Sequence, residues 1–253
     1  MKIDRQQILK KFKNYVDEFA GVDRGVQLKY AHSLRVAHLS EQIAASLNLS
    51  KEDIDLAWLI GILHDIGRFE QLRRYHTFID YQSMDHAKYG VHYLFDEGHI
   101  RDFIASGDED DVIKAAVGEH NVYKIRDGLT PRQDQFTRLI RDADKVDIFR
   151  VYVMYMEKHI NIWHIDFSDM NKQSISDRVM AQARARTLVR TQDKLTFIDF
   201  FVGVLCLYFD LNFAKSRELT WKEGNYEKLL HYHSKNPDTE EKLEEIRQMV
   251  RSR

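Results

Sequence analysis

The sequence contains few residues that interrupt helices and almost none that form covalent cross-links. Its 253 residues include two prolines, Pro131 and Pro237, and one cysteine, Cys206. A single cysteine excludes an intramolecular disulfide and a metal site built from several thiolates. The longest apolar run, residues 200–209, is about half the roughly 20 residues of a membrane helix. Because the first residues also lack the apolar stretch of a signal peptide, we expect a cytoplasmic protein without membrane spans.

An excess of charge of one sign is also missing. Lys and Arg number 38 against 40 Asp and Glu, which gives a formal net charge of −2. Proteins whose main task is to coat nucleic acid usually have a basic excess, so no stable nucleic-acid complex is expected. The hydrophobic fraction of 43% is enough for a substantial core. A homo-oligomer stays open.

The chain is instead rich in helical periodicity, since its apolar residues recur mostly at spacings of three and four. We therefore predict an all-α fold. Ser50 and Asp53 resemble a capping box that starts a helix near Lys51, and Gly67 is expected to mark its end. Residues 68–82 are interpreted as a short helix or ordered loop, and the polar stretch 164–173 is the best candidate for a boundary. The remaining helices are predicted at 3–19, 26–47, 83–97, 109–120, from Pro131 through RLIRDADKVDIFR, 150–160, 174–189, 195–216, 222–231 and 239–251.

Twelve histidines exceed the usual number for such a chain. A single histidine is more often an ordinary core or surface residue than a ligand, so we looked for those on apolar helix faces with an acidic or histidine companion. Asp147 lies one turn after Asp144 on the same predicted helix. Six inward-facing groups from five predicted helices meet the criterion: His32, His64, Asp65, His86, His120 and Asp144.

The stretch GILHDIGR, residues 61–68, shows why these groups indicate a site. His64 and Asp65 end the most apolar helix of the chain. Burying such groups costs free energy unless they are hydrogen-bonded or ligated. Imidazoles with carboxylates suit divalent Fe, Mn, Co, Ni or Zn, and a bound ion activates water and polarises phosphoryl oxygens. The residues alone thus support a metal-site hypothesis without a local metal motif.

Three phrases together resemble the signature of the HD-domain superfamily of metal-dependent phosphohydrolases. They are YAHSLRVAHLS around His32, HDIG at 64–67, and RDADKVDIFR around Asp144. The resemblance covers about residues 25–155. It implies a single all-helical domain over 1–253, with an HD helical bundle at about 25–155 and a helical extension at about 156–253 packed on it.

The resemblance also implies a ligand set and one or two divalent ions (Fe, Mn, Co, Ni, Zn or Mg). The implied metal ligands are His32, His64, Asp65 and Asp144. His86 and His120 are candidates for a second metal site or for contact with phosphate, in which case Asp65 bridges two ions. Binuclear members often carry a histidine pair where this chain has Glu119-His120, so one ion and two ions both stay open.

The reaction that the resemblance implies is hydrolysis of a small phosphomonoester or phosphodiester, commonly a nucleotide, with Asp65 at the catalytic centre and a water on the metal as nucleophile. Some mononuclear nucleotidases carry a glutamate shortly after the HD pair, where this chain has Arg68. A guanidinium fits phosphate oxygens, so Arg68 is a candidate to bind phosphate, and Lys145 beside Asp144 is a second. For both residues, an ion pair on the surface is an equally good interpretation.

Two other functions stay open. A few HD-fold proteins use a mixed-valent di-iron pair to oxygenate carbon or phosphonate substrates, which requires both metals and hence His86 and His120. A regulatory nucleotide-binding module without turnover is disfavoured by the complete ligand set. The identity of the substrate cannot be read from the chain.

Overall fold

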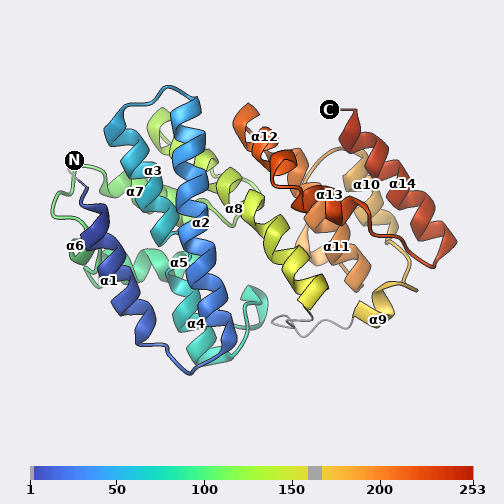
Figure 1. The fold of residues 1–253 in the computed structure, drawn as a ribbon, viewed down its shortest axis with the longest axis horizontal. Helices are drawn as coiled ribbons and strands as arrows, with labels where there is room; N and C mark the ends of the chain where they lie inside the picture. The colour runs from blue at the N-terminus through green and yellow to red at the C-terminus, as the bar shows by residue number, and fades with distance from the viewer. Residues whose placement is uncertain (1–2, 159–166, 253) are drawn as a thin grey trace. The chain divides into compact units, whose positions relative to one another are not determined.

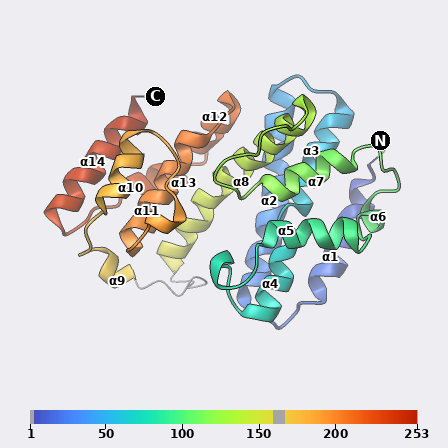
Figure 2. The same cartoon turned by 180° about the vertical axis from the view of Figure 1, so that it is seen from behind.

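The computed structural model describes residues 3–158 and 167–252, and within these ranges every regular element is helical. This confirms the all-α prediction. The chain divides into two compact units, Met1–Asp147 and Ile148–Arg253, which Figures 1 and 2 show from opposite sides. The predicted division into a bundle and an extension stays a prediction. Among the described residues, no helix has the length and apolarity to cross a membrane.

The first unit contains the helices that carry the predicted ligands. Its elements are α1 (Arg5–Asp17), α2 (Arg24–Ser46), α3 (Lys51–Leu63), α4 (Gly67–Tyr75), η1 (Asp80–Gln82), α5 (His86–Val91), the π-helical η2 (His92–Asp96), α6 (Ile100–Phe103), α7 (Asp110–Glu119) and the first part of α8 (Pro131–Lys158).

Helices α2 and α3 lie side by side and form the most extensive packing of this unit (Figure 1). Ser50 caps α3 by accepting a hydrogen bond from the backbone N–H of Asp53, as the sequence predicts. A Cβ atom on Gly61 would lie 2.5 Å from Cα of Ala37, so only glycine allows this approach of the two backbones. The contact fixes the separation of α2 and α3 close to the point where α3 ends.

Gly67 makes a second close backbone approach. A Cβ atom there would lie 2.2 Å from the carbonyl oxygen of His86, the first residue of α5. The prediction that Gly67 ends the preceding helix is wrong, because α3 ends at Leu63 and Gly67 is the first residue of α4. The glycine serves the packing of α4 against α5 rather than a helix end.

Two predicted helix boundaries, one in the first unit and one in the part of α8 that belongs to the second, differ from the structure for local reasons. The helix predicted over 83–97 begins only at α5, because the side chain of Asp85 caps it through the N–H groups of Ala87 and Lys88, and it continues as the π-helical η2. The separate helix predicted at 150–160 is wrong. Helix α8 continues to Lys158, since no glycine or proline interrupts it after Pro131.

The second unit holds the later helices. After the rest of α8 these are α9 (Phe167–Met170), α10 (Asp177–Arg184), η3 (Thr191–Asp193), α11 (Phe197–Leu205), η4 (Cys206–Asp210), α12 (Ala214–Lys222), α13 (Asn225–Leu230) and α14 (Pro237–Arg251). Helix α10 packs against α14 and α11 (Figure 2). The predicted boundary stretch 164–173 lies partly outside the described residues.

The prediction of one helix over 195–216 is wrong. Helix α11 ends at Leu205, whose carbonyl accepts a hydrogen bond from the hydroxyl of Tyr226 at 2.8 Å. The chain then forms the 3₁₀ turn η4, and Leu211 has an extended backbone (φ −72°, ψ 122°). A tertiary hydrogen bond at the helix end therefore overrides the helical periodicity, which cannot show such a partner.

Candidate metal centre

Four buried histidines lie around the carboxylate of Asp65, which is itself buried in the turn between α3 and α4. His32 comes from α2, and His64 immediately follows the last residue of α3. His86 begins α5, and His120 immediately follows the last residue of α7. Side chains that are far apart in the sequence thus meet because each sits inside or at the end of a helix of the first unit.

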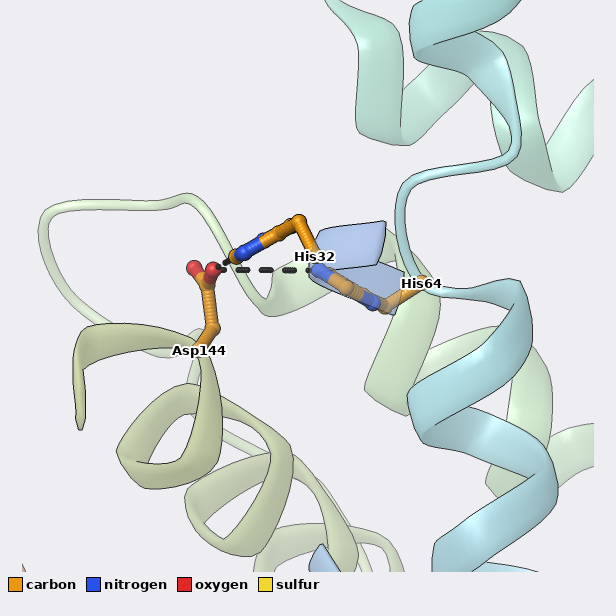
Figure 3. Close-up of side chains that lie close together, drawn as sticks. All are labelled: His32, His64 and Asp144. Atoms are coloured by element: carbon orange, nitrogen blue, oxygen red, sulfur yellow. Dashed lines mark ion pairs between the residues drawn. The ribbon is translucent and has the colours of Figure 1, made fainter. Parts of the chain in front are cut away.

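One side of this cluster consists of His32, His64 and Asp144, a residue of α8 (Figure 3). Oδ1 of Asp144 lies 3.0 Å from Nε2 of His32 and 3.7 Å from Nε2 of His64. Oδ2 of Asp65 lies 3.5 Å and 3.6 Å from the same two nitrogens. Two imidazole nitrogens and two carboxylate oxygens therefore face a common point, and these are ligand types that divalent transition metals accept.

The other side of the cluster consists of His86 and His120. Oδ1 of Asp65 lies 3.2 Å from Nε2 of His86 and 3.7 Å from Nε2 of His120. The two Nε2 atoms are 3.1 Å apart. Asp65 thus presents a different oxygen to each pair of histidines, which is how a carboxylate that bridges two ions would be placed.

Backbone carbonyls fix the rings of His64 and His120. Nδ1 of His64 lies 2.8 Å from the carbonyl oxygen of Gly61, and Nδ1 of His120 lies 2.7 Å from that of Val117. A carbonyl only accepts hydrogen bonds, so each Nδ1 carries the hydrogen and donates it. In the neutral ring the lone pair is then on Nε2, the atom that faces the centre.

Carboxylates fix the other two rings. Nδ1 of His32 lies 2.7 Å from Oδ2 of Asp147, and Nδ1 of His86 lies 2.8 Å from Oδ2 of Asp80. A carboxylate in this position is a common partner of a metal-binding histidine, because it orients the ring and raises its basicity. The sequence indicated only the position of Asp147, one turn after Asp144, and it missed Asp80, which follows an aperiodic loop.

The nitrogens that face the centre include atoms with no partner. Nε2 of His32 and Nε2 of His64 are buried without a hydrogen bond, and an unpaired buried polar atom costs about 1–3 kcal/mol. Burial and the charge of Arg68 lower the pKa of His86. Two neutral rings would then place the lone pairs of His86 and His120 against each other. These unsatisfied nitrogens and the mixed imidazole and carboxylate donors fit divalent metal ions.

The two central carboxylates are held in the charged form. Burial opposes ionisation of Asp65, but the charge of Lys29, with smaller contributions from the surrounding imidazoles, outweighs it and holds the pKa of Asp65 well below its usual range. Burial also opposes ionisation of Asp144, but the facing imidazoles of His32 and His64 keep the pKa of Asp144 well below its usual range. Both residues therefore offer anionic oxygens at neutral pH.

The two predicted phosphate-binding cations have different surroundings. Nη1 of Arg68 donates a hydrogen bond to Oδ1 of Asp80 at 2.7 Å, and Nε of Arg68 lies 3.5 Å from Oδ1 of Asp65. Lys145 is buried, and its ammonium donates a hydrogen bond to the carbonyl of Arg141, one turn earlier in α8. Arg68 thus lies beside the cluster but is engaged in an ion pair.

The structure adds a cation that the sequence analysis missed. Nζ of Lys29 lies 2.6 Å from Oδ2 of Asp65, and its side chain is 16% exposed. Lys29 lies one turn before His32 on α2, and this i, i+3 spacing was the available signal. The spacing alone does not identify Lys29, because a lysine near a helix start usually faces solvent.

Comparison with models of protein families matches residues 30–148 to the HD domain. The matched range contains all six predicted ligands as well as Asp80 and Asp147. No curated protein and no solved structure matches the chain.

Proposed function

Residues 30–148 match the HD domain, and from this premise we propose that the chain is a metal-dependent hydrolase that acts on a phosphomonoester or phosphodiester of the nucleotide type. The proposed partner is a small phosphorylated molecule rather than a nucleic acid. The proposed cofactor is a pair of divalent ions.

One observation carries the proposal, namely the convergence of four Nε2 atoms on the two oxygens of Asp65. Each ring is turned toward Asp65 by a partner on its Nδ1 atom. A structural cluster of buried histidines would instead use both ring nitrogens in hydrogen bonds. The Nε2 atoms of His32 and His64, which lack a hydrogen bond, favour a function that needs ligands.

The roles of the residues follow from their positions. His32, His64 and Asp144 would hold one ion, His86 and His120 the other, and Asp65 would contact both. Bound divalent ions lower the pKa of water and polarise phosphoryl oxygens. The ligands other than Asp144, whose side chain is 16% exposed, are almost fully buried, so the charges act in surroundings of reduced dielectric constant, where electrostatic stabilisation is strong.

The test is a screen of the full chain, stripped with a chelator and reloaded separately with Mn²⁺, Co²⁺, Ni²⁺, Zn²⁺, Fe²⁺ or Mg²⁺. The substrates are p-nitrophenyl phosphate, bis(p-nitrophenyl) phosphate, nucleoside monophosphates and a cyclic dinucleotide. We expect turnover of at least one phosphoester with at least one metal, and none in the stripped protein. Metal-loaded protein that hydrolyses none of them but binds a nucleotide would favour a regulatory module and contradict the proposal.

A di-iron oxygenase is the second candidate, favoured by the pairing of His86 and His120 on one oxygen of Asp65. This function requires iron at both positions. Metal analysis of protein purified without added metal, with electron paramagnetic resonance of the partly oxidised form, separates the two candidates. A mixed-valent di-iron signal together with oxygen consumption would replace the hydrolase proposal, whereas full phosphoesterase activity with redox-inactive Zn²⁺ or Mg²⁺ would exclude the oxygenase.

A further inference from the structure

Lys29 is a cation inside the centre that the function described so far does not use. Its Nζ atom is 2.6 Å from Oδ2 of Asp65, the oxygen that also faces His32 and His64. The side chain is 16% exposed and passes the ring of Phe78, with Nζ 5.6 Å from the ring centroid. The ammonium thus reaches the centre along a route that retains some solvent access.

The neighbouring guanidinium is less available. Nη1 of Arg68 donates to the carbonyl oxygen of Phe78 and to Oδ1 of Asp80, both at 2.7 Å, and to the side chain of Gln71. These bonds tie Arg68 to the segment that carries Asp80, the partner of His86. Lys29, by contrast, has Asp65 as its carboxylate partner among the described residues. Moving Lys29 would break one ion pair, whereas moving Arg68 would release the support of a ligand.

Oδ2 of Asp65 cannot serve Lys29 and a metal ion equally well. An ion held by His32 and His64 would attract the carboxylate of Asp65. The ion pair between Asp65 and the ammonium of Lys29 would then be weaker. A long, flexible side chain with three donors then needs another anion within reach. The anion that a phosphoesterase brings to this place is the phosphoryl group of its substrate.

We propose that Lys29 exchanges Asp65 for the phosphoryl oxygens of the substrate and acts as a substrate-binding residue. This inference rests on the proposed function, because it assigns a residue to the same site. It also specifies the substrate class. Asp65 and Asp144 bring anionic charge that the ions would offset, whereas Asp80 pairs with Arg68 and Asp147 with Arg35.

With two divalent ions and Lys29, the centre would retain several positive charges. A phosphomonoester dianion neutralises this excess better than a phosphodiester monoanion, and in surroundings of low dielectric constant that difference is large. The inference therefore favours phosphomonoesters over phosphodiesters as the substrate.

The test compares Lys29→Met, which keeps the length of the side chain, with Lys29→Arg, which keeps the charge. Lys13→Met is the matched control, because Lys13 pairs with Asp17 on the exposed surface of α1. The Mn²⁺-loaded proteins are titrated with inorganic phosphate by calorimetry, and their metal content is measured after desalting. Turnover of p-nitrophenyl phosphate and of bis(p-nitrophenyl) phosphate is measured in parallel.

For Lys29→Met we expect phosphate affinity to fall about tenfold or more, with metal content unchanged, and the monoester kcat/KM to fall more than the diester value. Lys29→Arg should keep most of the affinity, and Lys13→Met should match the wild type. Unchanged phosphate affinity in Lys29→Met, loss of metal from it, or no phosphate binding by the loaded wild type would each overturn the inference. Hydrolysis that does not depend on Lys29 would leave the proposed function standing, whereas Lys29-dependent phosphate binding without any hydrolysis would overturn the proposed function alone.

Discussion

Asp65 and Asp199 are both buried aspartates, one in each unit, yet their surroundings differ in kind. The carboxylate of Asp199 accepts hydrogen bonds from the N–H and hydroxyl of Ser176 and from the N–H groups of Leu195 and Thr196. It organises the start of α11, where Thr196 completes a capping box. Every partner of Asp199 is a donor with a hydrogen to give.

Asp65 is surrounded instead by the ammonium of Lys29, the guanidinium of Arg68 and four histidine Nε2 atoms. Nδ1 of His64 and Nδ1 of His120 donate to carbonyls of their own helices. Their Nε2 atoms therefore bring lone pairs toward a carboxylate, which is unfavourable without a cation between them. Burial of a polar group therefore does not by itself identify a site, whereas a set of buried hydrogen-bond acceptors that face one another does.

The largest expected effect is that of Asp65→Ala. Because Asp65 offers an oxygen to each histidine pair, its loss should remove both ions and reduce turnover to the background rate. Metal content by inductively coupled plasma spectrometry and phosphoesterase assays check this. Metal-dependent turnover retained by Asp65→Ala would show that Asp65 is not a ligand and that the two aspartates are alike.

His120→Ala should separate the two sides of the centre. We expect the metal content to fall from two ions to about one, since His32, His64 and Asp144 keep their geometry on the other side. Turnover should fall by roughly 100-fold, in the range seen when one electrostatic contact to a transition state is removed. His92→Ala, at an exposed histidine, is the control. Wild-type protein that holds only one ion would contradict the two-ion arrangement.

Asp199→Ala should affect stability alone. Removing the carboxylate leaves the N–H groups of Ser176, Leu195 and Thr196 without their acceptor, so the free energy of unfolding should fall by about 2–4 kcal/mol. Urea unfolding measures this, and metal content should stay at the wild-type value. Loss of metal in Asp199→Ala would contradict the purely structural role of Asp199.

The smallest expected effect is a pH dependence of the metal-free protein. Burial and Lys29 favour neutral His32, but the carboxylates of Asp144 and Asp147 outweigh them and raise the pKa of His32. A raised pKa means that this stabilisation is complete below the unfolded value of about 6.5 and is lost as the pH rises through the higher folded value.

The free energy of unfolding of chelated protein should therefore decline as the pH rises above about 6.5. His86, whose pKa is lowered, acts in the opposite direction but below that range. His32→Gln should abolish the decline, and urea titrations at several pH values check it. A decline of the same size in His32→Gln would assign the effect to another group.

Most helices of the first unit can be predicted from the sequence. Ser50 predicts the start of α3, and the apolar run of this helix predicts that His64 is buried. Apolar residues at helical spacing along α2 predict the same for His32. Ligands that sit on periodic helices can be found because burial and periodicity constrain the same residue. The all-α class follows from the same periodicity.

The remainder of the site depends on contacts that periodicity does not encode. Asp80 is positioned by Arg68 and Gln71 from another element, so no local pattern identifies it. Lys29 looks like a solvated residue until its partner across the centre is known. The break of the predicted helix at Leu205 likewise depends on Tyr226, which lies 21 residues further along the chain.

The two glycines of GILHDIGR have a consequence for the spacing of the ligands. Neither glycine offers a ligand atom, but Gly61 sets the approach of α3 to α2, and Gly67 sets that of α4 to α5. Both contacts are with backbone, which cannot swing aside as a side chain can. One added carbon at either position would move the helices that carry His32 or His86 while leaving every donor atom in the chain. If the centre holds ions as proposed, the spacing of its ligands depends on two missing methyl groups as much as on the chemistry of the ligands.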